Sequence, residues 1–306
     1  MKFPPFLTKG DKIAIVSPAG KIDRSVVERG AELLRKQGFV VEIGKHAFDA
    51  YGVFAGSDED RALDMQKALD DKKVKAIFCS RGGYGSLRIQ QRLNWSAFFK
   101  KPKWIVGFSD ITVFHSYLSQ HQIASIHGVM PAFFERDGAP TESFTRTIAL
   151  LNGQIPDYSI DPHPLNRLGE ASGMLTGGNL SMLQSVRGTP LDFSPKGRIL
   201  FIEDIAEYRY HLDRMMINLK VGRILEQISG LIVGHFSEMK DGEAPYGKSA
   251  YEIIHEAVAE YHYPVLFNFP AGHELPNFPL LLGSWISLNV TSNEATVKWG
   301  KVVSNR

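Results

Sequence analysis

Ser109 has the sequence setting of a nucleophile, because it follows a short apolar run and precedes a helical pattern in the segment WIVGFSDI, residues 104–111. In α/β proteins a strand that ends in a tight turn exposes such a side chain. The N–H groups of the helix that follows can then stabilise an oxyanion. The segment resembles the G-x-S-x-G elbow, although Ile111 stands where the second glycine would be. A serine that only caps a helix gives the same pattern, so both interpretations stay open here.

A glycine-rich segment, SRGGYGS at residues 80–86, also follows an apolar run and opens a helical pattern. Glycines let backbone N–H groups approach a ligand closely. The segment is not a P-loop, because it lacks the Gly-Lys-Ser/Thr ending. It is not a dinucleotide fingerprint, because Arg88 occupies the position of the third glycine. It is therefore either a loop that donates N–H groups to an oxyanion beside Ser109, or a tight turn without a chemical role.

A serine nucleophile needs a general base, and three histidines compete for that role. His273 lies in the proline-flanked loop FPAGHELPN, residues 269–277, directly after an apolar run. His235 follows the apolar segment LIVG in a similar setting, and His127 lies close in sequence to Ser109. Loops on a rigid scaffold often carry reactive groups, which favours His273. Any one of the three, taken alone, is more commonly a hydrogen-bonded structural histidine.

The base in turn needs an acid that orients it, and Glu203 is the candidate because it ends the apolar run at residues 199–202. Asp204 follows it, and the alternation of side chains along a strand places the two on opposite sides. The chain order Ser…Glu…His is that of the α/β-hydrolases. A solvated strand end would explain the same acidic residues.

Metal-binding patterns are weak in this sequence. His255 and Glu256 do not begin an H-E-x-x-H motif, because residue 259 is alanine. We interpret Asp204, Glu207, His211 and Asp213 as residues that cap and solvate a helix from Arg209. We therefore expect neither a metal nor a cofactor.

Composition excludes several classes of protein. The 306 residues are 43% hydrophobic, enough for two domains with cores of their own, and 35 basic against 33 acidic residues argue against nucleic acid as a partner. The one cysteine, Cys79, lies in an apolar run and is interpreted as a buried thiol. The N-terminus lacks the apolar core of a signal peptide, and no run approaches the ~18 apolar residues of a membrane span. We expect a soluble, cytoplasmic protein that does not act at a membrane.

The first half of the chain alternates between strand-like and helix-like segments. Expected strands are 12–17, 40–43, 75–79, 104–107 and 123–126, and expected helices are 23–36, 58–71, 84–93 and 110–120. Such alternation predicts a parallel sheet with ligands beyond the carboxyl ends of its strands. The loops 17–20, 80–85 and 108–110 all fall there.

The second half is less regular. Residues 134–168 are polar and proline-rich, with one helical stretch near 143–151, and are expected to connect two domains. Beyond them, expected strands are 171–175, 198–202, 230–233, 265–268, 285–289 and 295–299. Expected helices are 180–186, 209–221 and 250–261. We therefore divide the chain into domain 1–135 with the nucleophile, connection 136–168, and domain 169–306 with the acid and the base.

These segments together resemble the LD-carboxypeptidases, the muramoyl-tetrapeptide carboxypeptidases of the S66 type of serine peptidase. The similarity runs through nearly the whole chain. It is carried by GDKIAIVSPAG at 10–20, RGGYG at 81–85, GFSD at 107–110, HG at 127–128, LTGGNL at 175–180, FIED at 201–204 and GH at 272–273. Several motifs in the right order are more specific than any one of them.

The resemblance implies a role for each candidate residue. Ser109 would be the nucleophile, His273 the general base and then acid, and Glu203 the group that orients His273. Oxyanion donors would be the backbone N–H groups of Asp110 and Gly83, with Gly82 as a close second. The family also implies an N-terminal parallel-sheet α/β domain, a C-terminal β-rich α+β domain, an active site at the domain interface and a homodimer.

The implied substrate is a cytoplasmic murein peptide. The reaction would hydrolyse the bond between the L-centre of a diaminopimelate or lysine residue and a terminal D-alanine, in recycling of the cell wall. A carboxypeptidase must hold the terminal carboxylate of its substrate, and Arg81 is the candidate, with a structural salt bridge equally possible. Gly82 and Tyr84 are further candidates for substrate binding.

Three rival functions remain open. A subfamily resembling microcin self-immunity proteins cleaves peptidyl- or aminoacyl-nucleotides with the same triad, and it would need an aromatic shelf for the base. Tyr84, Phe133, Phe134 and Tyr208 could supply that shelf. The second rival is a non-catalytic protein that binds an anionic ligand, and the third and weakest is a metal-dependent amidase.

Overall fold

The computed structural model describes residues 1–302, which form two compact units. The first comprises Met1–Ile155 and Phe278–Leu282, and the second comprises Pro156–Asn277 and Gly283–Val302. The segment 136–168, expected to be a connection, contains β6 (Glu135–Arg136, in part), β7 (Ala139–Pro140), α6 (Glu142–Leu151) and β8 (Tyr158–Ile160). Of these, α6 belongs to the first unit and β8 to the second.

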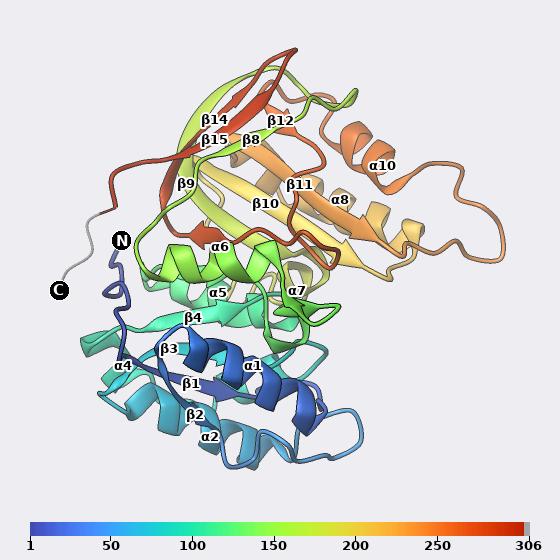
Figure 1. The fold of residues 1–306 in the computed structure, drawn as a ribbon. Coiled ribbons are helices and arrows are strands. Elements are labelled where there is room, and N and C mark those ends of the chain that lie inside the picture. The colour runs from blue at the N-terminus through green and yellow to red at the C-terminus, as the bar shows by residue number, and fades with distance from the viewer. Residues whose placement is uncertain (303–306) are drawn as a thin grey trace. The chain divides into compact units, whose positions relative to one another are not determined.

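The first unit is built on a six-stranded sheet in the order β13-β5-β4-β3-β1-β2 (Figure 1). Its strands are β1 (Lys12–Val16), β2 (Val40–Ile43), β3 (Val74–Cys79), β4 (Trp104–Gly107), β5 (Ser125–His127) and β13 (Leu280–Leu282). The first five are parallel, and only β13 runs antiparallel, beside β5. The carboxyl ends of β1, β3 and β4 thus lie at one edge, as the sequence pattern predicts.

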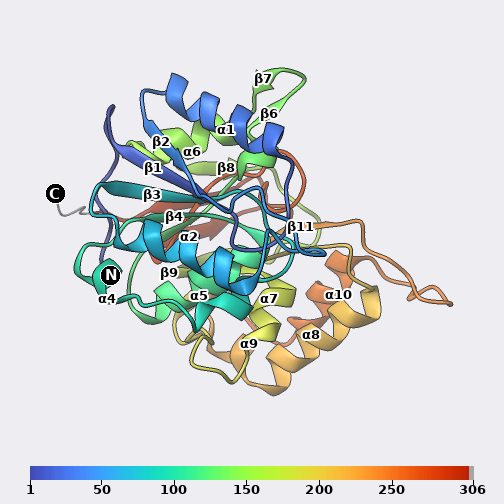
Figure 2. The same ribbon diagram turned by 90° about the horizontal axis from the view of Figure 1, so that it is seen from below.

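Helices cover both faces of this sheet. They are α1 (Arg24–Lys36), α2 (Asp58–Asp70), α3 (Ser86–Gln90), α4 (Ser96–Lys100), α5 (Thr112–Gln120) and α6, with 3-10 turns η1 (Ser109–Ile111) and η2 (Pro131–Phe133). Figure 2 shows α1 and α6 on one side of the sheet and α2 and α5 on the other. Buried residues of α2, α4 and α5 form one core with Ala14, Ile77 and Ile105 of the strands. A capping box between Ser57 and Asp60 starts α2.

The second unit contains a mixed seven-stranded sheet in the order β12-β11-β10-β9-β14-β15-β8. Besides β8, its strands are β9 (Gly169–Asn179), β10 (Arg198–Ile205), β11 (Gly230–Ser237), β12 (Val265–Leu266), β14 (Trp285–Val290) and β15 (Ala295–Trp299). The four strands from β12 to β9 are parallel, and β14, β15 and β8 are antiparallel. The expected fold class, a parallel-sheet α/β domain followed by a β-rich α+β domain, is confirmed.

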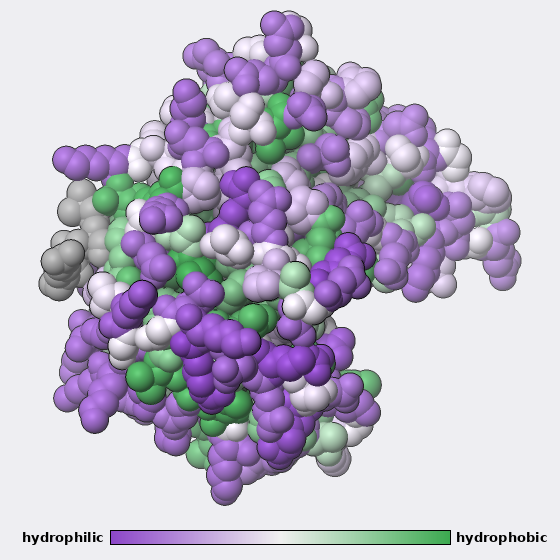
Figure 3. Space-filling view, viewed as in Figure 1, coloured by the Kyte–Doolittle hydropathy of each residue, from purple (hydrophilic) through white to green (hydrophobic). Residues whose placement is uncertain are grey.

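Four helices pack against the parallel part of the second sheet: α7 (Leu180–Ser185), α8 (Arg209–Val221), α9 (Ile224–Gln227) and α10 (Ala250–Ala257). Leu212, Met216, Ile253 and Ile254 of these helices form a core with Leu200, Ile202, Leu231 and Val233 of the strands. The loop between β11 and α10, orange at the right of Figure 1, is mostly hydrophilic in Figure 3. None of the helices in residues 1–302 is both long enough and apolar enough to span a membrane.

Some expected elements end elsewhere. The helix expected at 84–93 begins at Ser86, because Gly85 has a φ of 139°, which a helix does not contain. The strand expected at 265–268 covers only Val265 and Leu266, and Asn268 has a φ of 60°. The helix expected at 250–261 ends at Ala257.

Candidate active site

Ser109 is held in a strained turn directly after β4. Its φ is 62°, in the left-handed region that side chains other than glycine rarely occupy, and it begins the 3-10 turn η1 that leads into α5. A Cβ on Gly107 would lie 2.9 Å from Cγ1 of Ile111, so only glycine lets the strand end so close to the next helix. This geometry is that of a nucleophile elbow, and strain of this kind is characteristic of functional sites.

The glycine-rich loop after β3 lies against this turn. A Cβ on Gly82 would be 2.7 Å from Cβ of Ser109, 2.9 Å from its Oγ and 3.3 Å from the backbone nitrogen of Asp110. No side chain fits in that space, which explains a glycine at position 82. The structure therefore brings together Gly82, Ser109 and Asp110, three of the residues singled out in the sequence.

The loop is also tied to the loop that follows β1. The N–H of Gly20 donates to the carbonyl of Gly82 at 3.0 Å, and a Cβ on Gly20 would lie 2.9 Å from that oxygen. Earlier in the same two loops, directly after β1 and β3, the hydroxyls of Ser17 and Ser80 are 2.6 Å apart. The carboxyl ends of β1, β3 and β4 thus support one compact arrangement of backbone groups around Ser109.

The other candidates on this loop are accessible. Gly83 is exposed with a φ of 102°. Arg81 is exposed and donates from Nη1 to the carbonyl of Lys21 at 3.0 Å. Tyr84 is 50% exposed, and its ring lies 5.6 Å from that of Phe54. A substrate can reach all three residues, and Arg81 is not held in an ion pair with an acidic side chain in the contacts of the described chain.

His127, the third candidate base, is fully buried in the first unit, with its ring 5.8 Å from that of Phe108. Phe134 is also fully buried, where its ring contacts those of Phe78 and Phe144. Phe133 is partly buried against Phe108. The expectation that Phe134 could form part of an aromatic shelf is wrong, because its ring belongs to the core.

The second unit brings Glu203 and His273 together. Nδ1 of His273 lies 2.7 Å from Oε2 of Glu203, and the exposed fractions of the two side chains are 10% and 0%. A carboxylate only accepts, so Nδ1 carries a proton, and in the neutral ring the lone pair is on Nε2. This is the arrangement that an imidazole needs to act as a general base. Ser109 belongs to the first unit and this pair to the second.

The pKa of His273 is raised above its ordinary value, because the effect of neighbouring acidic groups exceeds that of burial. Burial alone lowers the pKa of this imidazole, but the charge of Glu203 and the hydrogen bond with it, aided by Asp204 and Glu238, raise the pKa above its ordinary value. The pair therefore stabilises an imidazolium, the species that forms when a base takes a proton from a nucleophile.

Glu203 lies at an irregularity in the sheet. The register between β10 and β11 shifts between Ile202 and Asp204, and such bulges often occur beside active sites. A Cβ on Gly272 would lie 3.2 Å from Oε2 of Glu203 and 3.0 Å from Cβ of His235. Gly234 and Gly272 both lie against Glu203, and their lack of side chains leaves space for the buried carboxylate.

Asp204 has different partners from Glu203, as the alternation along the strand predicts. Its carboxylate accepts from Asn179 Nδ2 at 2.8 Å and from the backbone N–H and hydroxyl of Ser181 at 2.9 and 2.7 Å. Burial and the neighbouring Glu203 raise its pKa to about 6. Asp204 thus fixes the end of β10 to the start of α7, next to the Glu203–His273 pair.

His235, the rival base, is partly buried beside this pair. Its backbone N–H donates to the carbonyl of Ala271 at 2.8 Å, and burial lowers the pKa of its imidazole. No carboxylate is hydrogen-bonded to its ring in the described contacts, so the geometry favours His273 over His235 as the oriented base.

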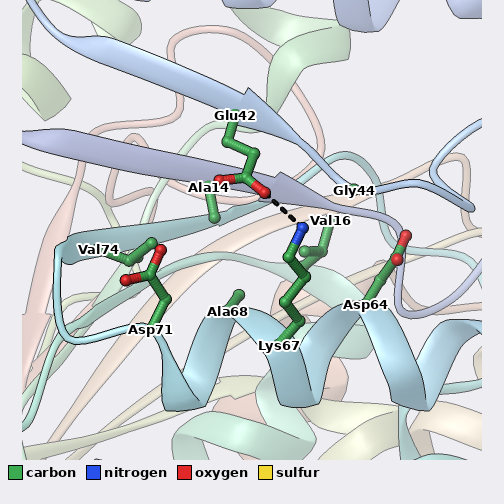
Figure 4. Close-up of a pocket in the computed structure, with 9 residues that line it drawn as sticks. All are labelled: Ala14, Val16, Glu42, Gly44, Asp64, Lys67, Ala68, Asp71 and Val74. Carbon is green, nitrogen blue, oxygen red and sulfur yellow. Dashed lines mark hydrogen bonds and ion pairs between the residues drawn. The ribbon is translucent and has the colours of Figure 1, made fainter.

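Two of the other charged clusters in the described part of the first unit lie near α2. A small pocket between α2 and the strands β1 to β3 contains the ion pair of Lys67 and Glu42, 2.7 Å apart (Figure 4). In the described chain, His46, Asp49 and Asp60 could also offer ligand atoms to a metal, within 4.8 Å of one another. Asp60 is already used in the capping box of α2, and His46 is paired with Asp49. Neither cluster includes a candidate catalytic residue.

The sequence alone did not identify two residues beneath the elbow. Arg61 of α2 is 1% exposed, and His115 of α5 is 2% exposed. The signal for Arg61 was its spacing: it precedes Met65 and Ala68 by four and seven residues, on the buried face of the helix. His115 likewise lies on an apolar helix face, next to Phe114.

Comparisons with known proteins assign this chain to a family. Residues 13–128 match the family model of the LD-carboxypeptidase N-terminal domain, and residues 172–288 match that of the C-terminal domain. A probable murein peptide carboxypeptidase of Bacillus subtilis is 31% identical over 304 residues, which cover 97% of this chain and 94% of the relative. The chain belongs to the LD-carboxypeptidase family.

Solved structures share the fold of this chain. The muramoyltetrapeptide carboxypeptidase of Oxalobacter formigenes superposes with a TM-score of 0.86 at 28% identity, and covers 95% of this chain and 99% of that one. The microcin C7 self-immunity protein MccF of Escherichia coli is 24% identical over 327 residues, which cover 95% of this chain and 94% of that relative. A structure of MccF with glutamyl sulfamoyl guanosine has a TM-score of 0.85 at 21% identity, which shows the fold alone. As an LD-carboxypeptidase family member, the chain is a peptidase with a peptide substrate.

Proposed function

We propose that this LD-carboxypeptidase is a serine enzyme that removes the terminal D-alanine from murein tetrapeptides. The observation that carries the proposal is the 2.7 Å hydrogen bond between the buried Glu203 and Nδ1 of His273, which leaves Nε2 of His273 as a base. The strained Ser109 supplies the matching nucleophile. The named relatives from Bacillus subtilis and Oxalobacter formigenes support the substrate class.

In the proposed reaction, Oγ of Ser109 attacks the carbonyl carbon that precedes D-alanine, and its proton passes to Nε2 of His273. The oxyanion accepts hydrogen bonds from the backbone N–H groups of Asp110 and of Gly83, or Gly82 in its place. His273 then donates its proton to the departing amine, which releases D-alanine and leaves an acyl ester on Ser109. Water, deprotonated by His273, cleaves that ester and restores the serine.

Substrate recognition follows from the accessible groups near the elbow. We propose that the guanidinium of Arg81 binds the terminal carboxylate, because it is exposed and its one hydrogen bond within residues 1–302 goes to the Lys21 carbonyl. Gly82 and Tyr84 would contact the peptide, Gly82 through its backbone and Tyr84 through its exposed ring. We further propose, from the family resemblance, that the enzyme acts in the cytoplasm as a homodimer in the recycling of wall peptides.

A nucleotide-linked substrate is the second candidate. It is favoured by one observation, a pair of exposed tyrosines in the segment that follows Glu203: the rings of Tyr208 and Tyr210 are 5.4 Å apart and 40% and 47% exposed. Such a surface suits stacking with a nucleobase. MccF, whose structure holds an aminoacyl sulfamoyl nucleoside, supports the same alternative.

The test measures D-alanine release from a murein tetrapeptide, with and without chelator, and cleavage of an aminoacyl sulfamoyl nucleoside in parallel. The variants are Ser109→Ala and, as a control, Ser292→Ala in an exposed turn. Chelator-resistant release that only Ser109→Ala abolishes supports the proposal, as does a tripeptide adduct on the peptide containing Ser109 in quenched samples. Cleavage of the nucleoside alone supports the alternative. Release that survives in Ser109→Ala contradicts Ser109 as nucleophile.

A further inference from the structure

A buried arginine lies under the proposed oxyanion donors. Arg61, in the first turns of α2, is 1% exposed, although the burial of a guanidinium is costly unless its N–H groups are paired. Arg61 lies on the buried face of α2, which it shares with the apolar residues Met65 and Ala68. A charged residue on this face is expected to form hydrogen bonds or ion pairs that an apolar residue could not form.

The guanidinium of Arg61 binds two backbone carbonyls and one carboxylate. Nη1 donates to the carbonyl of Pro18 at 2.5 Å and to the carbonyl of Gly85 at 3.0 Å, while Nη2 forms an ion pair with Asp58. Pro18 lies in the loop after β1, and Gly85 closes the glycine-rich loop after β3. One guanidinium therefore joins two loops at the carboxyl edge of the sheet.

Each loop leads on to the candidate oxyanion donors. Next to Gly85, the N–H of Ser86 donates to Oδ2 of Asp110 at 2.7 Å, and Asp110 is fully buried. The positive charge of Arg61 also attracts this carboxylate. In the other loop, two residues after Pro18, the N–H of Gly20 donates to the carbonyl of Gly82. Arg61 is thus linked to the Ser109 turn through both loops, by way of Gly85, Ser86 and Asp110 in one and Pro18, Gly20 and Gly82 in the other.

The guanidinium of Arg61 is closely surrounded by its neighbours. A Cβ on Gly85 would collide with Nη1 of Arg61, so the loop approaches the arginine as closely as a backbone can. The ring of Phe54 lies over the guanidinium carbon at 4.9 Å and also contacts Tyr84. Nη1 and Nη2 of Arg61 are thus paired, whereas its buried Nε has no hydrogen-bond partner in the described structure.

We propose that Arg61 is a positioning residue, which holds the glycine-rich loop against the Ser109–Asp110 turn so that the oxyanion donors are preorganised. The inference rests on the proposed function for its kinetic consequence, but the geometry of the loop can be measured independently. Arg61 does not touch the substrate in this proposal. It acts through Gly85, Ser86 and Asp110, so its loss should affect the transition state more than the binding of the ground state.

The experiment compares Arg61→Met and Arg61→Lys with Arg88→Met. Arg88 is the matched control, because its guanidinium also binds Asp58, at 2.7 and 2.9 Å, but its side chain is exposed. Only its backbone N–H reaches Gly85, at 3.1 Å from the carbonyl, among the described contacts, and the substitution keeps that bond. We expect kcat for D-alanine release to fall about 10- to 100-fold in Arg61→Met with KM within twofold, since a displaced donor costs rate at this scale. Arg61→Lys should recover part of the loss, and Arg88→Met should retain the native kcat.

Hydrogen exchange of the backbone amides in residues 81–90, read by mass spectrometry, is the second measurement. We expect faster exchange there in Arg61→Met than in Arg88→Met, with the rest of the chain unchanged. A folded Arg61→Met with native kcat and native exchange overturns the proposal. So does a fall in kcat that only tracks a general loss of stability.

The role of Arg61 can still be tested if Arg61→Met does not fold or if the native protein is inactive. If Arg61→Met does not fold, Arg61→Lys decides by the same two measurements. If the native protein releases no D-alanine, the proposed function fails, and the exchange of residues 81–90 still tests the role of Arg61.

Discussion

The imidazole of His115 donates a hydrogen bond from Nε2 to the carbonyl of Gly107 at 2.9 Å, from helix α5 back to the last residue of β4. Because a carbonyl only accepts, Nε2 carries the proton, and Nδ1 accepts from the hydroxyl of Ser125 at 2.9 Å. Burial favours the neutral form of this ring, which links helix α5 to the strand end from which the Ser109 turn begins.

This contact predicts a pH dependence of stability. Burial lowers the pKa of His115 from 6.5 to about 4. Between these values the unfolded chain binds a proton that the folded chain does not, so stability is lost as the pH falls through this window. The shift corresponds to about 3 kcal/mol at the lower end.

Urea unfolding at pH 7, 6, 5 and 4 measures the effect. His115→Gln should be less stable at pH 7, and its free energy of unfolding should fall less steeply with decreasing pH than that of the native protein. The control, His262→Gln at an exposed position, should follow the native curve. An unchanged slope in His115→Gln would show that another group carries the dependence.

Gly82 predicts a steric effect on catalysis. In Gly82→Ala the added methyl would lie 2.7 Å from Cβ of Ser109 and 2.9 Å from its Oγ, so either the loop or the serine must move. We expect kcat for D-alanine release to fall at least about 100-fold, because a displacement of about 1 Å at reacting atoms costs that much. Gly242→Ala is the control, since a Cβ at Gly242 meets nothing within 4 Å. A Gly82→Ala enzyme with native kcat would show that this contact relaxes without consequence.

The positions of these groups were only partly predictable from the sequence. The bounds of β2, β4, β15 and α8 match the expected ranges residue for residue, because apolar residues at the spacing of a strand or a helix and nearby turn residues define them. β13 was not expected, since it has only three residues, between Pro279 and Gly283, and pairs with β5, far away in the sequence. Pairing across such a separation leaves no local pattern.

The candidate site shows the same division. The spacing around Ser109 indicated a strand, a turn and a helix, whereas the partnership of Glu203 with His273 spans 70 residues and was assigned by the family resemblance. The roles of Arg61 and His115 depend on distant backbone carbonyls, Gly85 and Pro18 for the one and Gly107 for the other. Carbonyls occur at every residue, so the sequence carries no sign of which one a buried side chain will bind.

The two candidate bases predict different consequences of the same substitution. His273 is hydrogen-bonded to Glu203, whereas His235 is partly buried without a carboxylate partner for its ring in the described contacts. His273→Gln should lower kcat for D-alanine release about 10³-fold or more, and His235→Gln less than about tenfold, because a general base contributes at this scale. Steady-state assays of the two purified variants at pH 8 separate them. A larger loss in His235→Gln would transfer the role of base to His235.

Glu203 makes the last prediction, which concerns the pH profile. A base must be neutral to accept a proton, so kcat/KM should decline as the pH falls below the pKa of His273, which Glu203 raises above its ordinary value against the effect of burial. In Glu203→Gln that negative charge is gone while burial remains, so the pKa of His273 should drop and the acidic limb should move to lower pH. The neutral amide can also donate to Nδ1 and so place the proton on Nε2, which blocks the base. A fall in kcat of about 10³- to 10⁴-fold is therefore expected.

The profile is measured as kcat/KM from pH 5 to pH 9 in the native protein, in Glu203→Gln and in the control Glu207→Gln. Glu207 lies in the same segment but pairs with His211 at 2.9 Å, so its substitution should leave both the rate and the limb in place. If Glu203→Gln lowers the rate without moving the acidic limb, His273 is not the group that titrates. If it moves the limb to higher pH, the charge of Glu203 does not govern the pKa of His273. The expected combination, a slower enzyme active to lower pH, identifies the carboxylate as both the orienting and the charge-stabilising partner of the base.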